Sequence, residues 1–345
     1  MWTTNDAGAR GRGTVRRVDD HREPAAADRP RPGGSRTLGR REANVGAPDQ
    51  PDDHPALVHV HGQRGQHSSD LVRRRQRAGE VVRVRRGTYV DAAAWAVLDD
   101  EARHHARVRA VVAAAAGPVT LSHWSAATVL GLPAVGRRDD RVHLVRAPAA
   151  GGRSHRDVVR HAVAEVPEAV LVDGLRCTAP ARTVVDLARL GGPVAGVAAG
   201  DAAVRRGLTT TDELVHEVER AARGRGVRAA RAVAALVDPL AESPGESLSR
   251  VRMAELGVPA PVLQHEVHDR HGLVGRVDFW WPEHGVVGEF DGRVKYAGAS
   301  HDVLWREKLR EDRLRAAGLG VARWTWADAW AGPPMLARLR AAGVR

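Results

Sequence analysis

Two short stretches near the end of the chain, separated by a Pro-to-Gly turn, constrain the fold more than any other part of the sequence. Arg276–Trp281 and Val286–Asp291 are rich in β-branched and aromatic side chains. This pattern predicts two antiparallel strands. Because successive side chains of a strand point to opposite faces, we expect Val277 and Phe279 on one face and Asp278 on the other.

The same alternation predicts a cluster of carboxylates. On the second strand Glu289 and Asp291 are expected on the face that carries Asp278. Like charges that face each other across a ladder repel, so three acidic side chains require a compensating cation. Oxygen ligands without Cys or His suit Mg²⁺ or Mn²⁺. The alternative is an ordinary hairpin whose acids face solvent.

Lysine is rare in this chain, and its positions favour a site in the same region. Only two of the 53 basic residues are lysines, Lys295 and Lys308. An ammonium group beside a metal and a scissile phosphate would stabilise developing negative charge during hydrolysis. Lys295 follows the acidic strand and is the first choice for this role, and Lys308 is the second.

Several motifs in the last hundred residues together resemble a known group of enzymes. They are Glu246 on a helix, R-V-D-F, G-E-F-D-G-R-V-K-Y, E-K-L-R-E-D-R-L-R-A-A-G and V-A-R-W. Residues 242–328 are therefore similar to nuclease-like domains related to very-short-patch repair endonucleases of the PD-(D/E)XK group. The resemblance implies a central mixed sheet flanked by helices and a divalent-metal phosphodiesterase site.

The resemblance also implies roles for single residues. Asp278 matches the first metal carboxylate and Glu289 the second, and Asp291 stands where the group usually has its lysine. That departure leaves Lys295 to act from a shifted position. If Lys295 does not reach the site, the domain binds DNA without cutting it. Two residues of the following helix are expected to face the substrate backbone, namely Lys308 and Arg310.

Glu246 has two interpretations. Ser243 before Pro244, with Glu246 three residues after the serine, forms a capping-box pattern that by itself explains the glutamate. The resemblance instead implies a helix-borne acid at the catalytic site, and both roles are compatible.

Positive charge is concentrated in the first half of the chain. The net charge is +11, and residues 56–95 hold eight basic and three acidic residues. A short helix after Ser68 or Ser69 and a basic hairpin predict a winged-helix-like module. Its arginines are expected to contact DNA phosphates: Arg73, Arg74, Arg75, Arg77, Arg83, Arg85 and Arg86. The alternative is a solvated basic hairpin that packs on the next region.

Residues 96–239 predict a mixed α+β region without a catalytic constellation. His123, His143, His155 and His161 lack metal-ligand spacing and are expected to be structural. The motifs L-S-H-W-S-A and G-L-R-C-T-A-P-A-R-T-V-V-D-L resemble actinobacterial proteins with an AbiEi-type antitoxin module. This resemblance implies DNA binding and autoregulation, and it makes a toxin partner or a homodimer an expectation to test.

The sequence also predicts individual elements. Among them are a helix over Thr120–Leu130, a hairpin from Val170 to Cys177, and a strand over Leu319–Trp326 with Trp324 and Trp326 on one face. One cysteine, Cys177, excludes an intramolecular disulfide. No apolar run is long enough for a membrane span, and the N-terminal residues lack the apolar stretch of a secretory signal, so we expect a cytoplasmic protein.

Together these patterns predict an α+β multidomain protein. Residues 1–55 are expected to be a disordered or wrongly assigned tail, 56–95 the winged-helix-like module, 96–239 the AbiEi-like region, and 240–345 the nuclease-like α/β domain. The expected function is DNA binding with Mg²⁺-dependent (or Mn²⁺-dependent) endonuclease activity. The alternative is a non-catalytic antitoxin or transcriptional regulator, and an RNA-processing nuclease is a third interpretation.

Overall fold

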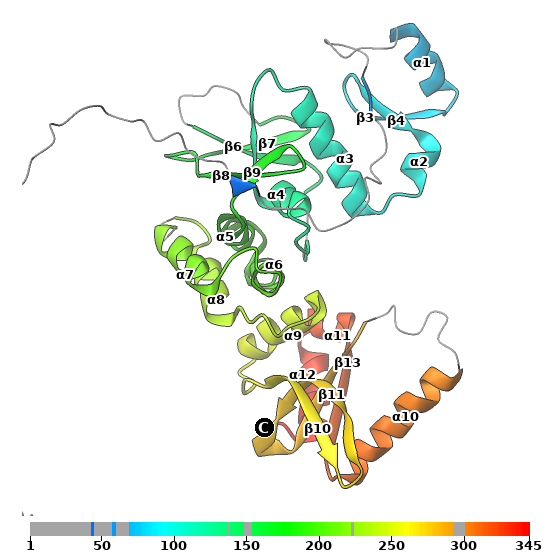
Figure 1. Ribbon diagram of the computed structural model, residues 1–345, viewed down its shortest axis with the longest axis vertical. Helices are drawn as coiled ribbons and strands as arrows, with labels where there is room; N and C mark the ends of the chain where they lie inside the picture. The colour runs from blue at the N-terminus through cyan, green and yellow to red at the C-terminus, as the bar shows by residue number, and fades with distance from the viewer. Residues whose placement is uncertain are drawn as a thin grey trace, which may run out of the picture. The chain divides into compact units, whose positions relative to one another are not determined.

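The computed structural model describes residues 43–44, 57–59, 69–136, 139–147, 154–221, 224–292 and 301–345 (Figure 1). Lys295 and most of the predicted tail lie outside these residues. Residues 42–345 form one compact unit by their contacts. Within the described residues, none of the helices has both the length and the apolar character needed to span a bilayer.

The basic front module consists of a helix beside a small sheet, as its sequence predicts. The strand order is β2-β4-β3. Val72 of the helix packs with Val81 and Tyr89 of the sheet. The elements are β2 (Val58–His59), α1 (Ser69–Arg77), β3 (Val81–Arg85), β4 (Thr88–Asp91) and the short α2 (Ala92–Ala96).

The middle region contains a six-stranded sheet of order β1-β8-β9-β5-β6-β7, in which parallel and antiparallel pairs are mixed. Its strands are β1 (Ala43–Asn44), β5 (Thr120–Leu121), β6 (Val142–Arg146), β7 (Val158–Ala162), β8 (Ala169–Val172) and β9 (Leu175–Thr178). Its helices are α3 (Asp100–Ala113), α4 (His123–Val129), α5 (Pro180–Gly191), α6 (Pro193–Arg205), α7 (Thr211–Arg220) and α8 (Val227–Leu236).

Two sequence predictions in this region have different outcomes. The β8–β9 hairpin is confirmed, and its turn residues Asp173 and Gly174 have φ values of +48° and +73°, as a two-residue hairpin turn requires. The single helix over Thr120–Leu130 is wrong at its start. Thr120 and Leu121 instead form β5, which pairs with both β6 and β9, so sheet pairing outweighs local helix propensity there.

The C-terminal region has a four-stranded sheet with helices on both faces (Figure 1). Its strand order is β10-β11-β12-β13, and only the β12–β13 pair is parallel. Leu248 and Met335 pack with one face, and Leu314 packs with the other. The elements are α9 (Pro244–Glu255), β10 (Val262–Asp269), β11 (Gly272–Trp281), η1 (Pro282–His284), β12 (Val286–Asp291), α10 (His301–Ala316), β13 (Gly320–Thr325), α11 (Trp326–Ala331) and α12 (Pro333–Ala342).

The predicted alternation along β11 fails at Asp278. Val277 packs with Leu314 on the α10 side, whereas Phe279 stacks near Trp324 on the opposite side, so the two do not share a face. Paired residues of β11 and β12 extend only to Phe279 and Gly288. Beyond them the Phe290 N–H donates to Asp278 Oδ2 at 2.9 Å. This side-chain bond occurs where β11 changes from the face of Val277 to that of Phe279 between adjacent odd-numbered residues.

Trp324 and Trp326 were expected on one strand face, and this prediction is wrong. Trp324 is fully buried and donates its ring N–H to Ser249 Oγ at 2.8 Å, but Trp326 opens α11 and is 38% exposed. Thr325 ends the strand because it forms a capping box with Asp328. The tight packing of Trp324 also explains Gly288, since a Cβ there would lie 2.7 Å from the Trp324 ring.

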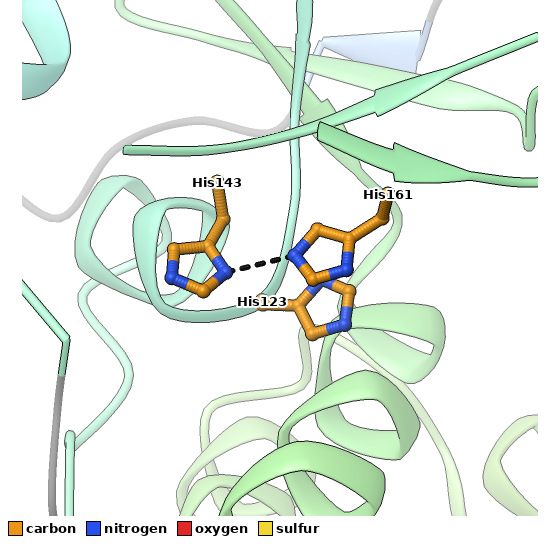
Figure 2. Close-up of side chains that lie close together, drawn as sticks. All are labelled: His123, His143 and His161. Atoms are coloured by element: carbon orange, nitrogen blue, oxygen red, sulfur yellow. Dashed lines mark hydrogen bonds between the residues drawn. The ribbon is translucent and has the colours of Figure 1, made fainter. Parts of the chain in front are cut away.

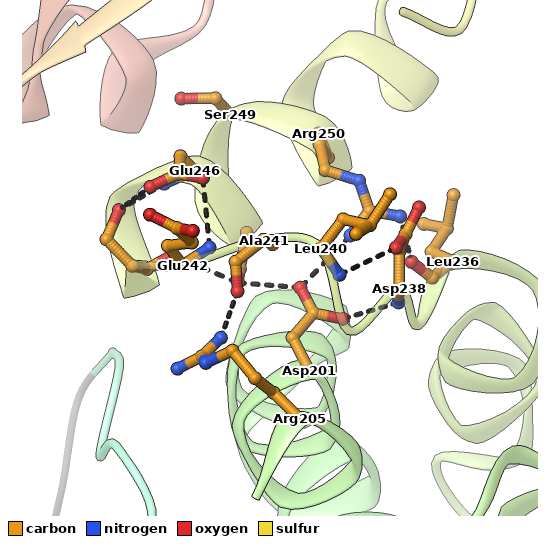
Figure 3. Close-up of polar contacts among 12 residues, drawn as sticks. Asp201, Arg205, Leu236, Asp238, Leu240, Ala241, Glu242, Glu246, Ser249 and Arg250 are labelled. Atoms are coloured by element: carbon orange, nitrogen blue, oxygen red, sulfur yellow. Dashed lines mark hydrogen bonds and ion pairs between the residues drawn. The ribbon is translucent and has the colours of Figure 1, made fainter. Parts of the chain in front are cut away.

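A buried ionic contact joins the middle region to α9 (Figure 3). Asp201 of α6 accepts hydrogen bonds from Ser247 Oγ at 2.7 Å and from Arg250 at 3.0 Å. The Asp238 N–H donates to its other oxygen at 2.8 Å, and Arg250 also donates to the Leu236 carbonyl. The expected boundary at residues 239 and 240 is thus crossed by a network whose carboxylate is only 1% exposed.

Candidate functional site

The first candidate site is the pair Asp278 and Glu289. Phe279 and Gly288 form the last pair of the antiparallel ladder; Asp278 directly precedes Phe279, and Glu289 directly follows Gly288. Beyond that pair the regular ladder ends, and Asp278 accepts the N–H of Phe290, the residue after Glu289. Asp291 lies at the end of β12, where it pairs with Thr325 of β13. The hairpin prediction therefore brings Asp278 and Glu289 to neighbouring strands.

Guanidinium groups neutralise Glu289. One of its carboxylate oxygens accepts a bond from Arg310 of α10, and the other lies 2.9 Å from Arg323 of β13. Burial raises the pKa of Glu289, and the two guanidinium groups counteract that rise. The same arginines contact Glu307, which lies 3.1 Å from Arg310. Glu289 thus belongs to a network of two glutamates and two arginines.

The three predicted carboxylates do not fit a shared ion in this arrangement. A three-carboxylate site needs one oxygen of each residue near a common point. Among the described residues, the set of three side chains that meets this requirement contains histidines and none of Asp278, Glu289 and Asp291. Both oxygens of Glu289 face arginines, and Asp278 accepts a backbone N–H.

Glu246 takes the capping role. Ser243 Oγ accepts the Glu246 N–H at 3.2 Å and donates to Glu246 Oε1 at 2.6 Å. The other oxygen accepts the Glu242 N–H at 3.0 Å and the side-chain amide of Gln264 at 2.9 Å. The predicted cap is confirmed, and every oxygen of this buried carboxylate has a partner within the protein.

Lys308 and Arg310 of α10 differ in their surroundings. Lys308 is exposed, and its Nζ lies 5.7 Å from the centre of the Trp305 ring. Arg310 points back to the sheet, where it contacts Glu289 and donates to the Arg276 carbonyl at 2.9 Å. Of the two, only Lys308 is placed to meet a partner in solvent.

The second candidate site is the basic module, where the predicted arginines divide into two groups. Arg75 lies 3.0 Å from Glu80, and Arg85 donates to the Ala110 carbonyl at 3.3 Å, near the end of α3. These two residues have structural partners. The remaining arginines are exposed: Arg73, Arg74, Arg77, Arg83 and Arg86. Within the described residues, Arg73 alone of these five has an ion pair, at 3.9 Å from exposed Asp70.

The third candidate site is one that the sequence did not predict. The rings of His123 from α4, His143 from β6 and His161 from β7 gather at one point (Figure 2). One ligand nitrogen from each lies within 4.8 Å of the others. His143 Nδ1 and His161 Nε2 are hydrogen-bonded at 2.9 Å, and the His123 and His161 rings stack with centroids 3.8 Å apart. His155 is not part of the group.

These three histidines are held in the neutral form. Burial, followed by the neighbouring rings, lowers the pKa of His123 well below its usual value. Burial and His161 lower the pKa of His143 to about 4. Burial and nearby Arg141 lower the pKa of His161. Neutral imidazole is the form that binds metal ions.

The cluster was missed because its members lie 20 and 18 residues apart and on three different elements. Short metal motifs place ligands on one turn or one helix, and this spacing has no such signature. Parallel pairing of β6 with β7 puts His143 beside the strand that carries His161. Only this long-range pairing, which the sequence does not specify, brings the rings together.

Comparison with known proteins gives a distant relationship. No known family model matches the chain. Two proteins from strains of Mycobacterium tuberculosis, Rv2248 and MT2308, are each 35% identical to it over 147 residues, and both are described as uncharacterized. The match covers 43% of this chain and 54% of each relative, so the chain spans about half the length of these relatives.

Proposed function

We propose that this chain binds DNA through the basic module of α1, β3 and β4. The observation that carries the proposal is a set of exposed arginines without ion pairs among the described residues: Arg74, Arg77, Arg83 and Arg86. Free guanidinium groups on a folded surface are suited to phosphate contacts, which supply most of the affinity in non-specific DNA binding.

The other arginines of the module support this interpretation because they stiffen it. Arg75 connects the helix to Glu80, and Arg85 connects the hairpin to the carbonyl groups of Ala110 and Val111. Val72, Val81 and Tyr89 form the small core beneath. A backbone fixed in this way need not be ordered on binding, so the ordering cost is confined to the exposed arginine side chains.

Salt-dependent binding tests the proposal. We expect the full chain to bind a fluorescent DNA duplex, with an affinity that falls as salt increases. In the variant Arg74→Ala/Arg77→Ala, the slope of log affinity against log salt should decrease by about two, roughly one for each phosphate contact. The matched control is Arg228→Ala/Arg231→Ala on α8, which removes two exposed arginines elsewhere.

Equal slopes in the two double variants would refute the assignment of the module. A preference for RNA of the same length would change the proposed substrate from DNA to RNA. Comparison of a duplex with a single strand of the same sequence completes the measurement and separates these outcomes.

A second candidate function is phosphodiester cleavage in the C-terminal region. Two observations favour it. Asp278 and Glu289 lie on neighbouring antiparallel strands, and the mixed sheet has helices on both faces, as the resemblance to PD-(D/E)XK nucleases implies. The arginine network around Glu289 favours the non-catalytic alternative, a DNA-binding regulator whose nuclease-like region does not cut.

Incubation of the full chain with plasmid DNA and Mg²⁺ distinguishes the two functions. For the regulator we expect no cleavage beyond that given by Asp278→Ala purified in parallel. Cleavage by the wild-type chain that Asp278→Ala abolishes would establish the nuclease. Equal residual cleavage by both proteins indicates a contaminating enzyme and supports the regulator.

A further inference from the structure

The histidine cluster has the composition of a metal site. Its three ligands come from three elements of one folded region, and His123 and His143 are buried. Imidazole nitrogen suits Zn²⁺, Cu²⁺, Fe²⁺ and Ni²⁺, whereas Mg²⁺ and Ca²⁺ prefer oxygen. Three protein ligands leave a fourth position open on a tetrahedral ion. The ligand set therefore points to a borderline divalent ion such as Zn²⁺.

A further observation indicates a ligand site rather than an ordinary histidine contact. His123 has a φ of +48°, a conformation that non-glycine residues adopt at a cost and that is concentrated at functional sites. His143 Nδ1 and His161 Nε2 face each other at 2.9 Å, so both nitrogens are directed into the cluster.

The cluster opens to a cavity that can supply the remaining ligand. A cavity of about 390 Å³ is lined by His143 and His161, together with Asp139 and Arg141. Asp139 and Arg141 form a bidentate pair with each other, with Nε–Oδ distances of 3.0 and 2.7 Å. Asp139 offsets part of the positive charge that Arg141 brings near the rings of His143 and His161. The cavity itself provides space for a bound water.

We propose that His123, His143 and His161 form a site for one Zn²⁺-class transition-metal ion, with a water molecule from the adjoining cavity in the fourth position. The ideal Zn–N distance is about 2.0–2.1 Å. The ligand atoms already lie within 4.8 Å of one another, so small ring rotations bring them to such a distance from one ion. The ion would replace the hydrogen bond between His143 and His161.

Metal titration of the full chain tests this site. After removal of metal with a chelator, Co²⁺ is added as a spectroscopic probe and Zn²⁺ as a competitor. We expect one Co²⁺ per chain, with the intense visible absorption of a tetrahedral ion, and its displacement by Zn²⁺. X-ray absorption of the Zn²⁺ complex should show three imidazole ligands. This measurement requires no variant.

Two variants locate the ion. His161→Gln should weaken Co²⁺ binding at least about tenfold, because loss of a ligand costs no less than loss of a second-sphere partner. His155→Gln is the matched control, because His155 is exposed, lies just before β7 and is outside the cluster. Circular dichroism checks that both variants fold, and His123→Gln replaces His161→Gln if that protein is unfolded.

The proposal is overturned if the wild-type chain binds no Co²⁺ or Zn²⁺, if X-ray absorption shows fewer than three imidazoles, or if folded His161→Gln and His123→Gln bind as tightly as the wild type. Binding lost equally in His155→Gln would also overturn it, because that residue does not contact the cluster. Binding that is intact in His155→Gln and weakened in His161→Gln supports the assignment.

Discussion

The histidine cluster and the acidic hairpin show opposite relations between sequence and geometry. The strand pattern predicts that Asp278 and Glu289 lie close together, yet in the structure their carboxylate oxygens bond to groups of the protein. His123, His143 and His161 have no shared sequence pattern, yet their nitrogens converge. Residue type explains the difference, since neutral rings can gather without counterions, whereas a buried carboxylate needs cations or hydrogen-bond donors around its oxygens.

The abundance of arginine determines how that neutralisation occurs. Only two of the 53 basic residues are lysines. A buried acid that pairs with a cation in this chain therefore pairs almost always with an arginine. Glu289 contacts Arg310 and Arg323, and Asp201 contacts Arg250. A carboxylate whose oxygens are bonded to guanidinium groups is less available to a metal ion.

Arg323→Met should destabilise the fold by about 3 kcal/mol, because it removes one of two cations that neutralise buried Glu289. Arg315→Met is the matched control on α10, where the ion pair with Glu311 has an arginine that is 63% exposed, and its cost should be about 0.5 kcal/mol or less. Urea unfolding at neutral pH measures both. Similar losses in the two variants would show that Glu289 does not depend on Arg323.

Asp201 provides a pH test of the second buried acid. Burial raises its pKa from 3.8 to about 6, despite the contact with Arg250. A folded-state pKa above the unfolded value means that stability is lost as pH rises from about 4 to 6, by about 3 kcal/mol at most. Asp201→Asn should lack this loss. The stability of wild type relative to the variant should therefore be lower at pH 7 than at pH 4.

Urea unfolding at both pH values gives this difference. A stability gap between wild type and Asp201→Asn that does not change with pH would mean that Arg250 fully compensates the buried charge. The free energy of unfolding would then not fall between pH 4 and pH 7 on account of Asp201, and burial of this carboxylate would have no cost that burial of the neutral histidines lacks.

Glu246 gives the smallest effect. Because its oxygens serve the helix cap, Glu246→Gln should cost about 1 kcal/mol and leave metal binding by the full chain unchanged. Glu283→Gln changes the same charge at an exposed position and should have almost no effect on stability. Thermal unfolding and Mg²⁺ titration compare the two variants, and weaker Mg²⁺ binding in Glu246→Gln alone would restore a metal role for this acid.

Local patterns predicted the local structure well. The β8–β9 turn, the Ser243 cap and the β11–β12 hairpin all follow from neighbouring residues. The capping box of Thr325 and Asp328 is a signal of the same kind, which the interpretation of Trp326 as a strand residue overlooked.

Long-range arrangements could not be predicted in the same way. The pairing of β6 with β7 assembles the histidines, and the approach of α10 and β13 brings arginines to Glu289. These contacts depend on how distant elements pack, which strand or helix periodicity does not encode. The sheet face of Val277 likewise departs from simple alternation at the point where Asp278 accepts the Phe290 N–H.

The buried contact between Asp201 and Arg250 limits how the regions of this chain can be exchanged between genes during evolution. A recombination event that transferred the residues after 239 to another gene would separate a buried acid from its cation. Each descendant would carry an uncompensated charge until a further substitution removed it. Transfer of the C-terminal region alone is therefore expected only where the residue left without its partner has been replaced.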